Sequence, residues 1–339
     1  MASLPFPGFY NPAQHTGDGI YAFDASNVMW LCSNSSPSGA ALFRSYDYGT
    51  TFEYLTALPG VLGSLAFDPA ITLGSSGTNT GFMIIIGQIQ NPLVSVDATS
   101  LVMYTYNTGS LGLVGPITLA TGVVGSDYDV VPLANGNFYV VTEMLDGNTA
   151  ELLGMEVAQT GAIVRQDDLA ANTFRGPGNS YSAISLVTPD GVNVEVYVAV
   201  MPRTFQFTLD QTNQAPAQLF QIIQSGGSIL SSAAIYSLNA TYIPDKLNVI
   251  YNSNVRYLSM SYLTQVGAVM VGHALLGQGI GPSGLSGSWA FGTRFGTLAH
   301  SIMEPTLFLS PSGLVFAYLD VAPATASTVD SPVILENLS

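Results

Sequence analysis

Short apolar runs, rich in β-branched and aromatic residues, recur along the whole chain between clusters of Gly, Pro, Asn and Asp. Typical runs cover residues 138–142, 194–200 and 315–318. Runs of this composition that are bounded by turn residues predict β-strands. No segment keeps an apolar stripe at the helical period of 3.6 residues beyond two turns. The pattern therefore predicts an all-β protein with very little helix.

The runs return at a nearly constant spacing, which indicates a repeated structural unit. Tight-turn chemistry (Asn-Gly, Pro-Asp or Pro-Ser-Gly) favours hairpins at residues 134–137, 188–191, 243–246 and 310–313. The second strand of each unit is expected to begin near Val28, Phe82, Phe138, Val194, Leu247 and Val315. These positions are 54, 56, 56, 53 and 68 residues apart. A glycine-rich insertion near 277–287 accounts for the long last gap.

Short strands in units of four at even spacing are typical of a β-propeller. Six units in 339 residues predict a six-bladed propeller, with a seven-bladed propeller as the alternative. A β-helix has much shorter rungs, a jelly roll has no reason to repeat at this length, and two stacked sandwiches would interrupt the spacing near the middle. The chain is predicted to be a single domain over residues 1–339.

An eight-residue motif in the first unit carries a family resemblance. Residues 45–52 read Ser-Tyr-Asp-Tyr-Gly-Thr-Thr-Phe, which resembles the Asp box (S/T-x-D-x-G-x-x-W/F) of sialidases and other BNR-repeat propellers. The resemblance implies a hairpin between the third and fourth strands of a blade. Its structural residues would be Ser45, Asp47, Gly49, Thr51 and Phe52, with Asp47 accepting hydrogen bonds, Gly49 supplying a conformation that suits glycine and Phe52 packing between sheets.

Weaker copies of the motif are expected at the matching turn of other units. Asp47 is replaced there by Asn107, Gln159 and Gln265, while the glycine that follows two residues later persists. Because Asp boxes lie away from the active centre of sialidases, Asp47 is expected to be structural.

An active enzyme is not expected from the residues. Sialidases bind the substrate carboxylate with three arginines, and none of the arginines here stands in a matching motif: Arg44, Arg165, Arg175, Arg203, Arg256 and Arg294. A retaining glycosidase needs two facing carboxylates, for which Glu143, Glu195 and Glu304 are available. No catalytic, cofactor-binding or metal-binding residue is predicted, and no cofactor.

The candidate metal ligands form no recognisable pattern. His15, His273 and His300 are scattered along the chain. Acidic residues that could suggest calcium do not form a D-x-D-x-D-G loop: Asp18, Asp24 and Asp68.

Charge and composition narrow the class of partners. Seven Lys+Arg against 22 Asp+Glu give a net charge of −15, and only 9% of residues are charged. Such a chain lacks the basic footprint that a nucleic-acid backbone requires. The single cysteine, Cys32, permits no internal disulfide and is expected to be a small core residue. The longest aliphatic burst, residues 82–86, is far shorter than a membrane span of about 20 residues.

The sequence style resembles structural proteins of tailed bacteriophages: little charge, glycine-rich loops, and no signal peptide at the start. We therefore expect a non-enzymatic structural or attachment protein of a bacteriophage particle, located in the tail, collar or capsid surface of the virion after synthesis in the host cytoplasm. Expected partners are other virion proteins, copies of itself, or a host-surface glycan or receptor. The alternative is a sialidase-like glycan hydrolase or a glycan-binding propeller. Residues 332–335 are expected to pair with residues 3–6 or with a neighbouring chain.

Overall fold

The computed structural model describes residues 2–4, 20–23, 28–36, 39–47, 51–59, 70–74, 81–90, 99–146, 149–169, 179–202, 217–238, 243–252, 254–266, 269–280, 289–294, 301–310, 313–321 and 333–337. Every element assigned in these residues is a β-strand. None of them belongs to a helix that could cross a bilayer. The all-β prediction is confirmed for the described chain.

Four of the sheets contain four antiparallel strands each. The first comprises β2 (Ile20–Phe23), β3 (Met29–Ser36), β4 (Gly39–Ser45) and β5 (Glu53–Ala57). The next comprises β13 (Asn179–Val187), β14 (Val194–Pro202), β15 (Gln218–Ser225) and β16 (Ser228–Ser237). It is followed by β17 (Ile243–Asn252), β18 (Val255–Val266), β19 (Val269–Ile280) and β20 (Trp289–Arg294). The last joins β21 (Ser301–Ser310), β22 (Gly313–Val321), β23 (Val333–Asn337) and β1 (Ala2–Leu4).

The remaining strands form a single seven-stranded sheet, in the order β12-β11-β10-β9-β8-β7-β6. They are β6 (Ala70–Leu73), β7 (Phe82–Gln90), β8 (Thr99–Asn107), β9 (Leu113–Pro132), β10 (Phe138–Asp146), β11 (Thr149–Val157) and β12 (Ile163–Asp168).

The predicted count of six separate four-stranded blades, or seven in the alternative, is wrong. Four sheets have this form, and β9 is the reason for the difference. The first part of this 20-residue strand pairs with β8 and its second part pairs with β10. One continuous strand therefore joins what the sequence spacing counts as two units.

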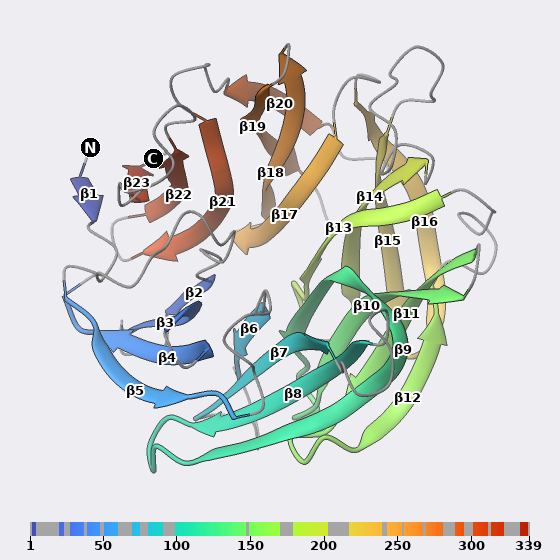
Figure 1. The fold of residues 1–339 in the computed structure, drawn as a ribbon. Coiled ribbons are helices and arrows are strands. Elements are labelled where there is room, and N and C mark those ends of the chain that lie inside the picture. Colours follow the sequence, from blue (N-terminus) through green and yellow to red (C-terminus); the bar gives the residue numbers. More distant parts are fainter. Residues whose placement is uncertain are drawn as a thin grey trace.

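The sheets stand around a common axis, as in a propeller (Figure 1). Their innermost strands contact one another in cyclic order, β2 to β6, β9, β13, β17, β21 and back to β2. The ring is closed by the two ends of the chain, because β1 pairs with β23 and places Leu4 opposite Val333. The expected pairing between these two segments is confirmed.

The β13–β16 sheet is buried on both faces, which explains its continuous apolar runs. On β14, Val194 and Val196 pack in a core shared with the β9–β12 strands, whereas Tyr197 and Ala199 pack in a core shared with β17–β19. Alternate residues of a strand point to opposite faces, so a sheet between two neighbours needs apolar residues at successive positions. Residues 194–200 show no polar face for this reason.

One of the predicted second strands is wrong. Leu247 lies in the innermost strand β17, and the second strand of that sheet is β18, which begins at Val255. The true hairpin lies between Asn252 and Val255, near Asn254 with its φ of 72°. With this correction the second strands begin at Met29, Phe82, Phe138, Val194, Val255 and Gly313.

The corrected starts are 53, 56, 56, 61 and 58 residues apart, so the exceptional gap of 68 residues disappears. The glycine-rich segment begins inside β19, which extends to Ile280, while residues 281–288 lie outside the described part. The copy of the motif near Gln265 is also misplaced. Gln265 lies near the end of the second strand of its sheet, β18, whereas Asn107 is the last residue of the third strand β8 and Gln159 follows the third strand β11.

Hydrogen bonds link successive innermost strands at one level of the ring. The Leu186 amide donates to Asp129 Oδ2 at 2.8 Å, the Val249 amide to Ser185 Oγ at 3.0 Å, and the Leu307 amide to Asn248 Oδ1 at 2.9 Å. In each case a polar side chain on one innermost strand binds the backbone of the next. We call these contacts the inter-sheet clasps. They fix the relative height of β9, β13, β17 and β21.

Candidate functional site

Irregular pairing marks the four innermost strands that the clasps connect. Opposite β10, strand β9 carries extra residues between Val124 and Tyr128. Strand β13 has an extra residue between Tyr181 and Ala183. Strand β17 has one more residue than its partner β18 between Pro244 and Leu247. Strand β21 likewise has one more residue than β22 between Met303 and Thr306. Such β-bulges re-aim side chains and are common beside active sites.

Three of these bulges contain a carboxylate residue: Asp127, Asp245 and Glu304. Each lies two or three positions before a clasp residue, namely Asp129, Asn248 and Leu307. Because the clasps hold their strands at one height, the three acidic positions lie at the same level around the axis. We call these three residues the bulge carboxylates.

The order of the strands places the bulge carboxylates on different sides of the ring. Between β9 and β21 lie β13 and β17 in one direction and β6 and β2 in the other, so Asp127 and Glu304 occupy opposite positions. Asp245 lies on β17, next to β21. The β17 bulge is held by a hydrogen bond of 3.0 Å from the Lys246 amide to Ser261 Oγ. Acidic positions on opposite innermost strands match the two flanking carboxyl groups that acid–base cleavage of a glycosidic bond uses.

Glu304 was among the acids available from the sequence, whereas Asp127 and Asp245 were missed. A usable signal was present in two cases. Pro244 directly precedes Asp245 and Pro305 directly follows Glu304, and each pair interrupts a strand. Proline inside a sheet is confined to edges, strand starts and bulges. An acid beside a proline within a strand-like run therefore indicates a bulge that carries a carboxylate.

Glu195, another of the acids considered, belongs to a buried network between two sheets. Its Oε2 accepts hydrogen bonds from Arg256 Nε at 2.7 Å and from the Tyr197 hydroxyl at 2.8 Å. Its Oε1 accepts from Arg256 Nη2. Gln221 Nε2 also donates to the Tyr197 oxygen at 2.6 Å. Both carboxylate oxygens of Glu195 are engaged, which makes it a structural ion pair between β14 and β18.

Burial and pairing control the protonation of this network. Burial raises the pKa of Tyr197 well above its usual range, and the adjacent Glu195 carboxylate raises it further. The hydrogen bond to Glu195 raises the pKa of Arg256. Tyr197 therefore stays a neutral donor and Arg256 stays charged. The third acid, Glu143, is buried within β10.

The described arginine side chains are engaged in ion pairs. Arg44 binds Glu53 at 2.7 Å near the β4–β5 turn, and Arg165 binds Glu156 and Asp167, each at 2.9 Å, at the outer strands β11 and β12. With the pair that contains Arg256, these contacts leave no three-arginine cluster among the described side chains. Arg175 and Arg203 lie outside the described residues, and Arg294 is described only as part of β20.

Within the described part of the chain, no group of three or more His, Cys, Asp and Glu residues could hold a metal ion. The His273 ring stacks on Tyr262 with centroids 5.2 Å apart, and its Nε2 lies 2.6 Å from Thr264 Oγ1. Burial lowers the pKa of His273. Cys32 is buried in β3. The other two histidines and Asp18, Asp24 and Asp68 lie outside the described residues.

The motif at residues 45–52 lies at the β4–β5 turn. Asp47 Oδ1 accepts hydrogen bonds from the Ser45 hydroxyl at 2.7 Å and from the Thr51 amide at 2.8 Å, and Oδ2 accepts from the Thr51 hydroxyl at 2.7 Å. These bonds lower the pKa of Asp47 to about 2, with the Thr51 amide as the largest cause. Phe52 is half-buried, and Gly49 lies outside the described residues. The structural role assigned to this motif stays a prediction.

No protein-family model and no curated protein matches the sequence. Solved structures do match it from end to end. A protein of unknown function from Dyadobacter fermentans has a TM-score of 0.64 at 11% identity, covering 98% of this chain and 97% of the other. An α-L-arabinanase from Penicillium chrysogenum, complexed with arabinobiose, has a TM-score of 0.64 at 12% identity, with 99% and 96% covered.

An α-L-arabinofuranosidase from Fusarium graminearum, complexed with an iminosugar inhibitor, has a TM-score of 0.61 at 9% identity, with 100% and 98% covered. At these identities the likeness shows a shared β-propeller fold. The expectation of a non-enzymatic bacteriophage structural protein is corrected by these matches, because two of these neighbours are an α-L-arabinanase and an α-L-arabinofuranosidase.

Proposed function

We propose that this protein is a glycoside hydrolase that cleaves a neutral glycan at the axis of its propeller. Support comes from the end-to-end likeness to an arabinanase and an arabinofuranosidase. The observation that carries the proposal is the ring of bulge carboxylates, with Asp127 and Glu304 on opposite innermost strands at the level of the clasps. Arabinose-containing oligosaccharides are the first substrates to test.

A neutral substrate fits the charge of the chain better than an anionic one. The net charge of −15 produces a negative potential that repels carboxylated sugars. The described arginine side chains are paired with Glu53, with Glu156 and Asp167, and with Glu195. A sialidase-like site needs guanidinium groups directed at the substrate carboxylate. This argues for a hydrolase of uncharged sugars within the glycan-active class.

The proposed chemistry uses two carboxyl groups on opposite sides of the scissile bond. One, protonated, donates its proton to the oxygen of the leaving group as the glycosidic bond breaks. The other, ionised, either attacks the anomeric carbon or removes a proton from the attacking water, and the separation of the two groups decides between these routes. Asp127 and Glu304 take these roles, and Asp245 lies beside Glu304 on the neighbouring strand.

The test is hydrolysis of arabinobiose and linear arabino-oligosaccharides, followed by chromatography of the released sugars. Asp127→Asn and Glu304→Gln are each expected to lower kcat by about 10²–10⁴-fold, because a lost acid or base costs that much. Melting temperatures should stay close to that of the wild type. The anomer released first, measured by NMR, distinguishes a nucleophilic carboxylate from one that activates water.

Glu195→Gln is the matched control, because it changes a carboxylate of the same kind outside the ring of bulge carboxylates. It should lower the melting temperature and leave kcat of the folded enzyme close to that of the wild type. Binding of the oligosaccharides without hydrolysis would favour the glycan-binding propeller instead. Full activity of both the Asp127 and Glu304 variants would overturn the assignment of these residues. The expected partners and cellular location stay predictions.

A further inference from the structure

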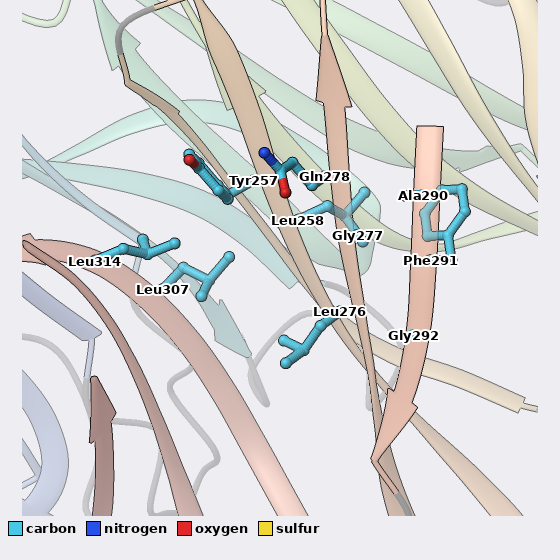
Figure 2. A pocket seen from close by; sticks show the side chains of 10 residues that line it. All are labelled: Tyr257, Leu258, Leu276, Gly277, Gln278, Ala290, Phe291, Gly292, Leu307 and Leu314. Atoms are coloured by element: carbon cyan, nitrogen blue, oxygen red, sulfur yellow. The ribbon is translucent and has the colours of Figure 1, made fainter. Parts of the chain in front are cut away.

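A hollow of about 360 Å³ opens between the β17–β20 sheet and the neighbouring β21–β22 strands. It lies at the small end of the range of ligand pockets, about 300–1,000 Å³. Figure 2 shows Tyr257 and Gln278 at one end, Leu307 and Leu314 on the β21–β22 side, and Leu276 opposite this polar end. The walls are therefore largely aliphatic, and two polar side chains are gathered at one place.

The polar end is built by strand pairing. Tyr257 and Gln278 are directly opposite each other on β18 and β19, and Gln278 is opposite Ala290 on β20. Side chains of directly opposed residues have their Cβ atoms about 5 Å apart. Tyr257 is half-buried and Gln278 is exposed. Among the described residues, neither the Tyr257 hydroxyl nor the Gln278 amide has a hydrogen-bond partner, so both are available to a ligand.

A glycine on the outermost strand keeps the hollow open. A Cβ atom added to Gly292 would meet no atom within 4 Å, and this residue does not have a positive φ. The fold therefore gives no steric reason for glycine at this position. Glycine weakens a strand interior, and it often marks a place where a ligand approaches closely.

Two other glycines of the same sheet show the contrast. A Cβ atom on Gly277 would lie 2.6 Å from the Phe291 ring, and one on Gly279 would lie 2.4 Å from the Trp289 ring. These glycines are required because aromatic rings cover them. At Gly292, by contrast, a Cβ atom would point into open space, on the side of the sheet that borders the hollow.

We propose that this hollow binds a small, mainly apolar ring compound that carries a single hydrogen-bonding group. The ring would lie between Leu276 and the pair formed by Leu307 and Leu314, over the space left by Gly292. The polar group would meet the Tyr257 hydroxyl and the Gln278 amide. Most of the lining comes from β18, β19 and β20, whereas Leu307 lies on the innermost strand β21, three residues after Glu304. The proposal does not depend on the hydrolase activity.

The probe is 2-naphthol, which combines two fused rings with one hydroxyl group. We expect saturation-transfer NMR and calorimetry to detect binding to the intact protein. Gly292→Leu should weaken the affinity at least tenfold, because the leucine side chain occupies the space of the ring, and it should not lower the melting temperature. Gln278→Ala should weaken binding several-fold, since it removes one polar partner.

Val164→Leu, on the exposed face of the outermost strand β12, is the matched control and should leave the affinity unchanged. If Gly292→Leu does not fold, Gln278→Ala alone decides the test. No binding of 2-naphthol, or binding that both variants leave intact, would overturn the proposal. Displacement of bound 2-naphthol by arabinobiose would also overturn it, because the site would then accept a sugar.

Discussion

The two faces of the β17–β20 sheet are built differently. Toward the β13–β16 sheet, Trp289 packs edge-on against Tyr197 with centroids 5.9 Å apart, and Phe291 contacts Tyr236 with centroids 4.3 Å apart. The Glu195–Arg256 pair completes this filled junction. Toward β21 and β22, the same sheet leaves the hollow.

Four consecutive residues of β20 encode this difference. They read Trp289, Ala290, Phe291 and Gly292, and alternate positions of a strand point to opposite faces. The aromatic residues fill one junction, while the small residues leave the other open. A propeller can therefore adjust each junction separately through the period-two pattern of a single outer strand, without any change in the hydrogen bonding of its sheets.

The filled junction should be the most sensitive to mutation. Arg256→Met removes the partner of a buried carboxylate and is expected to lower the free energy of unfolding by about 3–5 kcal/mol. Combining it with Glu195→Gln should recover part of this loss, because no charge is then left unpaired. Urea unfolding of the single and the double variant measures both effects. A loss below about 1 kcal/mol for Arg256→Met would show that the junction is held by its aromatic rings alone.

The junction between β9 and β13 contains a contact that should depend on pH, the hydrogen bond from the Leu186 amide to Asp129. Burial raises the pKa of Asp129 to about 6 from an ordinary value of 3.8, although hydrogen bonds from the Leu186 and Val130 amides oppose the shift. The folded protein therefore keeps the proton that the unfolded chain releases near pH 4. Stability should fall as the pH rises from about 4 to about 6, by up to about 3 kcal/mol.

Asp129→Asn should abolish this pH dependence and stabilise the protein above pH 6. An asparagine oxygen can still accept the Leu186 amide, as Asn248 accepts the Leu307 amide at the β17–β21 junction. Thermal unfolding at pH 4.5 and pH 7.5 measures the difference. An unchanged slope in the variant would mean that Asp129 is ionised throughout this range.

The glycines of the β17–β20 sheet give a direct test of filled against open space. Gly277→Ala places a methyl group against the Phe291 ring and is expected to cost about 1–3 kcal/mol. Gly292→Ala meets no neighbour and should stabilise the strand by about 0.5 kcal/mol. Urea midpoints of the two variants should therefore move in opposite directions. Equal losses would contradict the presence of the hollow.

The smallest effect is expected at Asp47, whose turn belongs to neither junction. Asp47→Asn should lower the melting temperature slightly, because a neutral amide accepts the Thr51 hydrogen bonds less strongly. The folded-state pKa of about 2 lies below the ordinary value of 3.8, so the stability contributed by the carboxylate should be lost between about pH 4 and pH 2. An unchanged acid unfolding profile in Asp47→Asn would remove this role.

The sequence predicted the strands and their spacing well, because apolar runs and Gly turns are local. The hairpin turns near Gly136 and Gly191 are confirmed by their positive φ and by turn hydrogen bonds. The Pro244-Asp245 pair has the same composition as a hairpin turn, yet it forms a bulge within β17. Only the pairing of β17 with β18, whose hairpin lies further along the chain between Asn252 and Val255, shows that residues 244–245 form a bulge and not a hairpin turn.

The continuity of β9 was unpredictable for a similar reason. Residues 120–126 contain no proline or asparagine that would stop a strand, and the pairing with β8 and β10 decides where it ends. The ring of bulge carboxylates also depends on contacts between distant segments. Asp127 and Glu304 share a level only because the inter-sheet clasps align their strands.

The pairing of β1 with β23 has a consequence for synthesis. The two strands are more than 320 residues apart in the chain and lie side by side in one sheet (Figure 1). A ribosome releases the amino-terminal segment long before β23 exists, so the last sheet lacks its outermost strand until translation has nearly finished. During this interval β1 lacks its partner strand β23, and the free edge of β22 can accept a foreign strand. Chaperones that shield exposed strand edges should therefore matter most for this protein at the end of translation.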